Sequence, residues 1–308
     1  MVATSEIVAP VAFVLMWSSA FIAGIIGVGA APPILVLFAR FTCAGLALTM
    51  YAVVVRARWP RGRQLAHVAV AGLLMQMVQF GGFYTAMADH VSAAVISLVQ
   101  GLNPVVIALF AGRVLHERVS ARQWLGFAVG GIGVGLAVVD QSHFTTTGLL
   151  LCVVGLLGLS LGTVYQKRYA PRADARTASA IHVLVSAPVA AVLMVVEGHT
   201  AISDPVRFTA ALAWMVAINA VASFLLLNAM LRRWDATRVG RLFFATPAVT
   251  SIMAWLVIAQ PLRPLTIAGL SVGLFGMVLA AQRAESAVRR ESAETVATQP
   301  RRLAGHHR

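Results

Sequence analysis

Residues 123–135 read QWLGFAVGGIGVG, and residues 266–278 read TIAGLSVGLFGMV. Both stretches are apolar and carry three glycines at the same spacing, and the second set lies 143 residues after the first. The same offset, without a gap, matches other residues of the two halves: Pro104 with Pro247, Ala86-Met87 with Ala229-Met230, Gln76 with Asn219 and Glu117 with Gln260. This regularity predicts that the chain consists of two related halves.

The apolar character of these stretches extends over most of the chain. Of its 308 residues, 59% are hydrophobic and 11% are charged, and the mean hydropathy is +0.83. A soluble domain needs more polar surface than this, whereas a membrane-spanning helix needs roughly 20 mostly apolar residues. We therefore expect an all-α integral membrane protein with ten transmembrane helices. They cover residues 7–28, 33–55, 65–87, 91–112, 120–139, 148–168, 178–197, 208–231, 236–258 and 264–282.

Each half then holds five helices, and an odd number makes the second half enter the membrane from the opposite side. The halves are therefore expected to be inverted five-helix repeats, related by a pseudo-two-fold axis in the membrane plane. Such repeats are typical of secondary transporters, whose substrate site lies near the midplane between them. The predicted units are residues 1–143 and 144–283 for the two repeats, and 284–308 for a disordered, charged cytoplasmic tail.

The basic residues alternate in sidedness along the expected helices. The formal net charge is +13, yet the loops on one side receive only Arg207 and Arg263. The other Lys and Arg residues outside the spans gather in every second connection, as in residues 56–63 and 167–176. An excess of Lys and Arg marks cytoplasmic loops. We expect a multi-pass protein of the cell inner (plasma) membrane, with both termini cytoplasmic, surrounded by lipid and without a nucleic-acid partner.

Short motifs along residues 7–283 resemble those of a known family. In chain order they are Met16-Trp17-Ser18-Ser19-Ala20-Phe21, Ala39-Arg40-Phe41, Phe83-Tyr84-Thr85-Ala86-Met87, Ser92-Ala93-Ala94, Asn103-Pro104 and His116-Glu117-Arg118 before Gln123-Trp124-Leu125-Gly126. With them the chain resembles the drug/metabolite transporter superfamily, in its EamA-like branch of ten-helix carriers. The sequence departs from the family pattern at Gln260, where an acidic residue is usual, and at Arg238 and Arg241, which replace apolar residues of the first repeat.

The resemblance implies a transporter of small metabolites. It also implies that six of the expected helices line the cavity, namely those over residues 7–28, 65–87, 91–112, 148–168, 208–231 and 236–258. Polar side chains in mid-span are costly unless they bond to each other, to backbone or to water in a cavity. The predicted substrate-binding residues near mid-span of these helices are therefore Trp17, Gln76, Gln100, Asn103, Ser160, Asn219 and Thr246. Gln79 and Phe83 join them because they share one helix face with Gln76.

Gln76 and Asn219 lead this set, because the repeat relates them and an amide can both donate and accept hydrogen bonds. The alternative is that such amides join helix to helix as packing contacts. Pro104 and Pro247 each remove a backbone hydrogen bond in mid-helix, so each is either a hinge or a static kink.

Three arginines are candidates for steering charge. Arg40 lies inside an apolar run, where it could attract a carboxylate or snorkel outward and pair with helix-end carbonyls; we expect the structural role. Arg238 and Arg241 lie at the expected cytoplasmic entrance of the helix over 236–258, where they could attract anionic or zwitterionic solutes.

These residues favour the export of amino acids or related small metabolites by alternating access. The second substrate class is amphipathic drugs or nucleobase-like solutes, which Trp17 and Phe83 would suit. No Asp or Glu occupies a mid-span position, so proton coupling through a buried carboxylate is not expected. Coupling then uses another group, such as His182, or is absent, and we expect facilitated movement. Cys43 and Cys152 fall inside apolar runs, and neither a metal nor a cofactor is expected.

Two further patterns have alternative interpretations. Gly158-Leu159-Ser160-Leu161-Gly162 fits the hydrolase pattern G-x-S-x-G, but it lacks the strand-to-helix turn of that motif, and an intramembrane hydrolase would need a partner such as His182. We therefore expect no enzyme. The repeated glycines of the opening stretches suit either close helix packing or a homodimer face.

Overall fold

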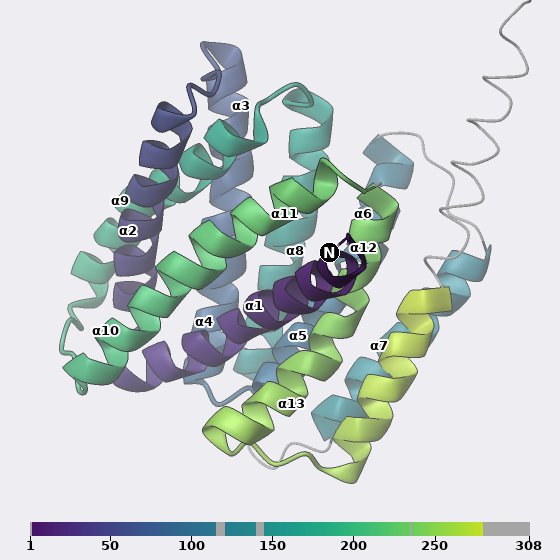
Figure 1. Cartoon of the computed structure of the whole chain (residues 1–308). Coiled ribbons are helices and arrows are strands. Elements are labelled where there is room, and N and C mark those ends of the chain that lie inside the picture. The colour runs from purple at the N-terminus through teal and green to yellow at the C-terminus, as the bar shows by residue number, and fades with distance from the viewer. Residues whose placement is uncertain (1, 115–120, 140–144, 235, 280–308) are drawn as a thin grey trace, which may run out of the picture.

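The computed structural model describes residues 2–114, 121–139, 145–234 and 236–279. Within these ranges the chain forms helices and short turns without a β-strand (Figure 1). Nine of the described helical stretches are long and apolar enough to cross a membrane, and Pro264–Leu279 is a shorter apolar helix. The predicted all-α membrane fold is confirmed. The predicted boundary at residues 143 and 144 and the predicted tail 284–308 lie outside the described residues.

The first half begins with α1 (Val2–Ala30) and α2 (Pro33–Val54). Its third span consists of α3 (Arg63–Gly72), the π-helical segment η1 (Leu73–Val78) and α4 (Gln79–Ala88). Its fourth consists of α5 (Ala93–Gly101) and α6 (Asn103–Val114), and α7 (Ala121–Val139) is the fifth.

The second half follows the same order. It begins with α8 (Thr146–Tyr169) and α9 (Ala175–Glu197). Its third span consists of α10 (Pro205–Trp214), the π-helical segment η2 (Met215–Ala222) and α11 (Ser223–Leu231). Its fourth consists of α12 (Ala236–Leu242), the 3-10 turn η3 (Phe243–Ala245) and α13 (Thr246–Ile258). The helix Pro264–Leu279 is the last described element.

Large apolar side chains cover the outside of the molecule as well as its interior. Val54, Val196 and Val206 are among many that are strongly exposed. In water such a surface would drive association, whereas in lipid it is the expected outer surface. Inside, Phe41 and Tyr84 belong to one large buried cluster that joins both halves.

The third span of each half contains a π-helical segment at an equivalent place. The 143-residue offset carries η1 onto residues 216–221, which lie within η2. A π-helical turn uses i→i+5 hydrogen bonds in place of i→i+4 and is frequent at functional sites. It also bends a helix. Gln76 lies in η1 and Asn219 in η2, so the two predicted residues occupy matching irregular turns.

The fourth span of each half is broken just before its proline. In the first half α5 ends at Gly101, and α6 starts at Asn103-Pro104. In the second half the 3-10 turn η3 precedes α13, which starts at Thr246-Pro247. Proline lacks a backbone N–H and suits the first turn of a helix, where no intrahelical partner exists for that group. Both predicted proline sites are therefore breaks in a span, and their hinge motion stays a prediction.

The two halves interlock through their first helices. α1 packs against α10, η2 and α13 of the second half, whereas α8 packs against η1, α4 and α6 of the first half. α2 and α9 run alongside each other (Figure 1). Each half therefore places its first helix in the other, as expected for a pseudo-two-fold relation between inverted repeats.

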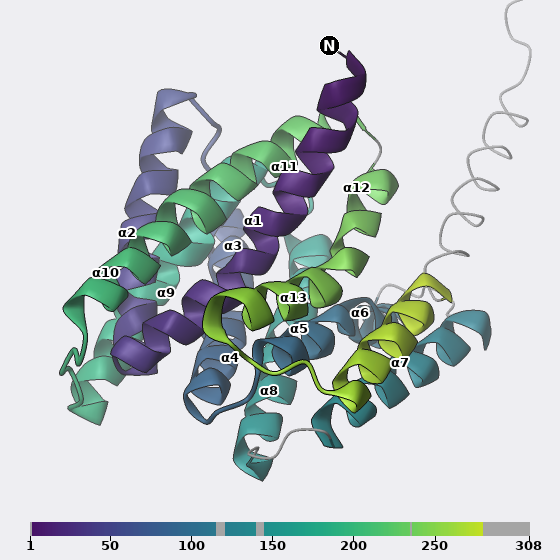
Figure 2. The same cartoon turned by 60° about the horizontal axis from the view of Figure 1, so that its bottom comes forward.

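The repeated glycines form a seam within one chain. A Cβ on Gly133 would collide with backbone atoms of Gly269 and Gly273, and one on Gly276 would collide with backbone atoms of Gly126 and Gly130. α7 and the helix Pro264–Leu279 therefore lie in direct backbone contact, side by side in Figure 2. Of the two predicted uses of the glycines, the structure supports close helix packing.

Candidate substrate pocket

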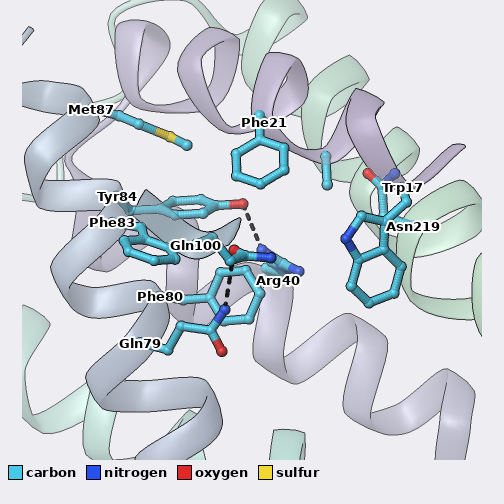
Figure 3. Close-up of a pocket in the computed structure, with 11 residues that line it drawn as sticks. Trp17, Phe21, Arg40, Gln79, Phe80, Phe83, Tyr84, Met87, Gln100 and Asn219 are labelled. Carbon is cyan, nitrogen blue, oxygen red and sulfur yellow. Dashed lines mark hydrogen bonds between the residues drawn. The ribbon is translucent and has the colours of Figure 1, made fainter. Parts of the chain in front are cut away.

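A pocket lies between α1, α2, α4, α5 and η2, with about 540 Å³ of space free of protein atoms, its mouth included. Small-molecule sites are mostly apolar with a few polar groups. The wall, drawn in Figure 3, consists of Trp17, Ala20, Phe21, Arg40, Gln79, Phe80, Phe83, Tyr84, Met87, Gln100 and Asn219. All but Asn219 come from the first half of the chain.

Arg40 is the charged residue of this wall. Its side chain is only 8% exposed. One terminal nitrogen, Nη1, donates a hydrogen bond to the Tyr84 hydroxyl at 2.6 Å, and that hydroxyl donates to the Met215 sulfur at 2.9 Å. The guanidinium carbon lies 4.0 Å from the centre of the Phe80 ring. These contacts fix Arg40 toward the pocket, so the expected outward snorkelling is wrong. The reason is tertiary: α4 supplies aromatic partners for the cation inside the bundle.

The energetics of Arg40 are close to balanced. Removing an ion from water costs several kcal/mol. A charge-assisted hydrogen bond returns about 1.5–3 kcal/mol, and a desolvated cation–π contact returns about 2 kcal/mol. Among the described residues, the pocket wall holds no Asp or Glu beside the guanidinium. The contacts with Tyr84 and Phe80 therefore offset much of the cost of burying Arg40. No carboxylate of the described wall pairs with its positive charge.

The pocket amides differ in how firmly they are held. Nε2 of Gln79 donates to Oε1 of Gln100 at 3.4 Å, a long hydrogen bond between two wall residues (Figure 3). Asn219 donates through Nδ2 to the Met16 carbonyl and to Oγ of Ser19, at 2.5 and 3.0 Å. Its Oδ1 is buried and has no partner among the described residues. Asn219 thus makes a packing contact between η2 and α1 and also lines the pocket. The two interpretations of this amide, packing and substrate binding, are therefore compatible.

Gln76 does not line this pocket, and Gln79 takes its place in the wall. Regular α-helical spacing would put Gln76, Gln79 and Phe83 on one face. Gln76 lies in η1, however, whose i→i+5 turns interrupt that spacing. Around this pocket the amide opposite Asn219 on the third span is that of Gln79, and a binding role for Gln76 stays a prediction.

Asn103 and Ser160 contact each other outside the pocket wall. Oγ of Ser160 donates to Oδ1 of Asn103 at 2.7 Å and to the Leu156 carbonyl at 2.8 Å. Ser160 is fully buried, and this bond ties α8 to α6. Neither partner is a base, so the hydroxyl lacks the activation that a nucleophilic serine needs. The geometry gives the G-x-S-x-G pattern a packing role.

Thr246 also lies outside the wall, although it is the repeat equivalent of Asn103. It is buried, and its carbonyl accepts a hydrogen bond from Ser18 at 3.4 Å. Trp17, which does line the pocket, packs edge-on against Phe243 with ring centres 5.0 Å apart. These contacts join α1 to the broken fourth span of the second half.

Arg238 and Arg241 are not among the wall residues. Both are exposed on α12, and the Arg238 guanidinium lies 4.4 Å from the centre of the Trp234 ring. Their role in steering solutes stays a prediction.

Sequence reasoning missed five wall residues: Ala20, Phe21, Phe80, Tyr84 and Met87. A signal was present for three of them, because Phe80, Tyr84 and Met87 follow the i, i+4, i+7 spacing of one helical face. An aromatic stripe at that spacing within reach of a buried arginine could have identified the wall.

Comparison with known proteins agrees with this architecture. The model of the EamA-like transporter family matches residues 4–139 and again 146–282. The uncharacterized transporter YvbV of Bacillus subtilis is 23% identical, over 83% of this chain and 85% of its own. A probable amino-acid metabolite efflux pump of Salmonella typhimurium is 21% identical, over 86% of this chain and 91% of its own.

A probable terminal-alkyne amino-acid exporter of Streptantibioticus cattleyicolor is 25% identical, over 88% of this chain and 91% of its own. One crystal structure of a protein aligns with a TM-score of 0.64 at 19% identity, over 92% of this chain and 99% of that one. This likeness supports the fold. Because the family model covers both halves, the chain is a member of the EamA-like transporter family.

Proposed function

We propose that this transporter exports amino acids or related small metabolites by alternating access between its two halves. The observation that carries the proposal is the pocket itself, where one buried cation and three amides lie among aromatic rings. Such a wall suits a small solute with both polar and apolar parts. The names of the relatives from Salmonella typhimurium and Streptantibioticus cattleyicolor, both concerned with amino-acid export, support the substrate class.

Alternating access is supported by where the helices are irregular. η1 and η2 match across the repeat, and so do the breaks before Pro104 and Pro247. The third and fourth spans of both halves thus have weak points near the middle. Inverted repeats can exchange roles as a carrier opens to either side, and matched weak points would let both halves bend at the same depth.

We further propose that both termini lie in the cytoplasm. With that orientation Pro33, at the start of α2, faces outside, and the basic connection that begins at Arg56 faces the positive-inside compartment. Labelling single cysteines introduced at residue 61 and residue 200, which are both exposed, with a membrane-impermeant maleimide would test it. We expect labelling from outside at residue 200 only, and the reverse pattern would overturn the orientation.

Transport by purified protein in liposomes tests the function. Liposomes that contain the protein and are loaded with labelled amino acids should release them faster than protein-free liposomes. Gln79→Ala and Asn219→Ala should each slow release several-fold, since a hydrogen bond to substrate contributes about 1 kcal/mol.

Gln76→Ala is the matched control, because it removes the same amide from the same span outside the wall. Equal effects of Gln76→Ala and Gln79→Ala would contradict the assigned pocket. Release of amphipathic aromatic cations but of no amino acid would favour the drug-exporter alternative, which the aromatic wall also supports.

A further inference from the structure

We propose, on the basis of the function above, that Arg40 binds the carboxylate of the substrate and that the pocket selects amphipathic carboxylates. These are molecules with a single carboxylate on an apolar body about the size of an aromatic ring. An ammonium group on the substrate is tolerated but is not what the pocket recognises.

Arg40 has hydrogen-bond donors that the protein does not use. A guanidinium carries five N–H donors. Among the described residues, the Tyr84 hydroxyl accepts one of them. The Phe80 ring covers a face of the group and accepts no conventional hydrogen bond. Figure 3 shows the guanidinium between Tyr84 on one side and Trp17 with Asn219 on the other. The planar fork of an arginine matches a carboxylate with two parallel hydrogen bonds.

The charge of the pocket wall is positive. The wall contains one cation and, within the part of the chain that the structure describes, no carboxylate. Ligands that neutralise Arg40 are stabilised in this low-dielectric place. An ammonium group would find only neutral acceptors among the wall residues. A ligand with a positive charge alone would also face the charge of Arg40.

The rest of the wall is mostly apolar. The rings of Phe80 and Tyr84 lie next to the guanidinium, and Trp17 lies on its other side (Figure 3). Phe21 and Phe83 add further ring surface to the wall. Burying apolar area is favourable at roughly 25 cal/mol per Å², and this wall offers that area next to the cation. One end of the ligand is therefore specified as anionic and the rest as apolar.

Three probes with the same phenyl ring separate these requirements: 3-phenylpropanoate has only the carboxylate, L-phenylalanine has both charges, and phenethylamine has only the ammonium. Binding to the purified full chain in detergent at neutral pH can be followed by Trp fluorescence and by calorimetry. We expect the two carboxylates to bind and phenethylamine to bind about 10- to 100-fold more weakly, the range of a charge-assisted pair.

Substitution of the arginine tests its role. Arg40→Gln should remove the preference for carboxylates, so that the three probes bind with similar affinity. Arg40→Lys should keep part of that preference. Arg207→Gln is the matched control, since Arg207 is exposed and paired with Asp204 outside the pocket. Phenethylamine binding as well as 3-phenylpropanoate would overturn the proposal, and this comparison needs only the parent protein if Arg40→Gln does not fold.

Binding and transport then separate the two proposals. Failure of both carboxylates to bind overturns the carboxylate site. Carboxylate binding that depends on Arg40, without any movement of labelled solutes across the liposome membrane, supports the carboxylate site and overturns the transport function.

Discussion

The first half of the chain supplies ten of the eleven residues that line the pocket, and the second half supplies Asn219 alone. The repeat equivalents of the other polar and aromatic wall residues are mostly small or aliphatic. Through the 143-residue offset, Arg40 corresponds to Val183, Gln79 to Ala222, Phe80 to Ser223, Phe83 to Leu226, Tyr84 to Leu227 and Gln100 to Phe243. The two halves therefore share a backbone plan and differ in the chemistry that they present to a solute.

What the halves retain in common is the irregular backbone. The π-helical segments η1 and η2 match, and a proline follows a break in both fourth spans. The contrast indicates which features duplication preserves. Backbone irregularities must occur in both halves if both are to bend, whereas one set of binding side chains suffices for one pocket.

The largest expected effect concerns the seam of glycines that the halves share. A Cβ on Gly133 would lie 2.6 Å from the Gly269 carbonyl oxygen and even closer to Gly273. Backbone cannot yield as a flexible side chain can, so Gly133→Ala should destabilise the protein by about 1–3 kcal/mol or more. Thermal unfolding in detergent and the yield of monodisperse protein would measure it.

Gly131→Ala is the control for this seam, because a Cβ at Gly131 on the same helix meets no atom within 4 Å. Alanine also favours a helix over glycine, so Gly131→Ala should be neutral or slightly stabilising. If the two variants melted at the same temperature, the seam between α7 and Pro264–Leu279 would be wrong.

The second-largest expected effect tests the difference in pocket chemistry between the halves. Tyr84→Phe removes the hydroxyl that accepts from Arg40, while the ring remains. The second half has Leu227 here, so the variant makes the two halves more alike. Without that hydroxyl the guanidinium is no longer held toward the pocket. Affinity for 3-phenylpropanoate, measured by calorimetric titration, should therefore fall about fivefold, as for a loss of about 1 kcal/mol in positioning.

Tyr165→Phe removes a hydroxyl that bonds to His67 outside the pocket wall, and it should leave that affinity unchanged. A loss of equal size in both tyrosine variants would mean that the effect is general rather than local to Arg40.

The smallest expected effect lies where the two halves begin their second helices. α2 starts with Pro32 and Pro33 and no side-chain cap, whereas Asp174 caps α9 through the backbone N–H of Arg176 at 3.0 Å. Hydrogen bonding from the Arg176 side chain holds the pKa of Asp174 below its ordinary value. Asp174→Ala should cost about 1 kcal/mol, as for other helix N-caps.

The pH dependence of this cap follows from the direction of the shift. The native state favours the ionised Asp174, so its contribution is fully present above the ordinary aspartate pKa and is lost as pH falls through the lowered pKa. The difference in melting temperature between parent and Asp174→Ala should therefore shrink under acidic conditions. A difference that stayed constant down to strongly acidic pH would contradict the role of the carboxylate.

The sequence predicted the candidate site less completely than the fold. Trp17, Gln79, Phe83, Gln100 and Asn219 were predicted and do line the pocket, whereas Gln76, Asn103, Ser160 and Thr246 do not. Position along an apolar run indicates depth in the membrane, and most of these residues were predicted from it. Which way each one faces depends on the π-helical turns and on the neighbouring helix.

The sequence by itself determined that this protein spans a membrane, that its two halves are related and that glycines recur at matching places. Length of an apolar run and recurrence at one offset are properties of the chain alone. Only the tertiary structure decided that α1 packs against the second half and α8 against the first. It also decided that the repeated glycines face each other, and that Arg40 contacts Phe80 and Tyr84 inside the bundle. These features depend on contacts between residues far apart in sequence, which no local pattern encodes.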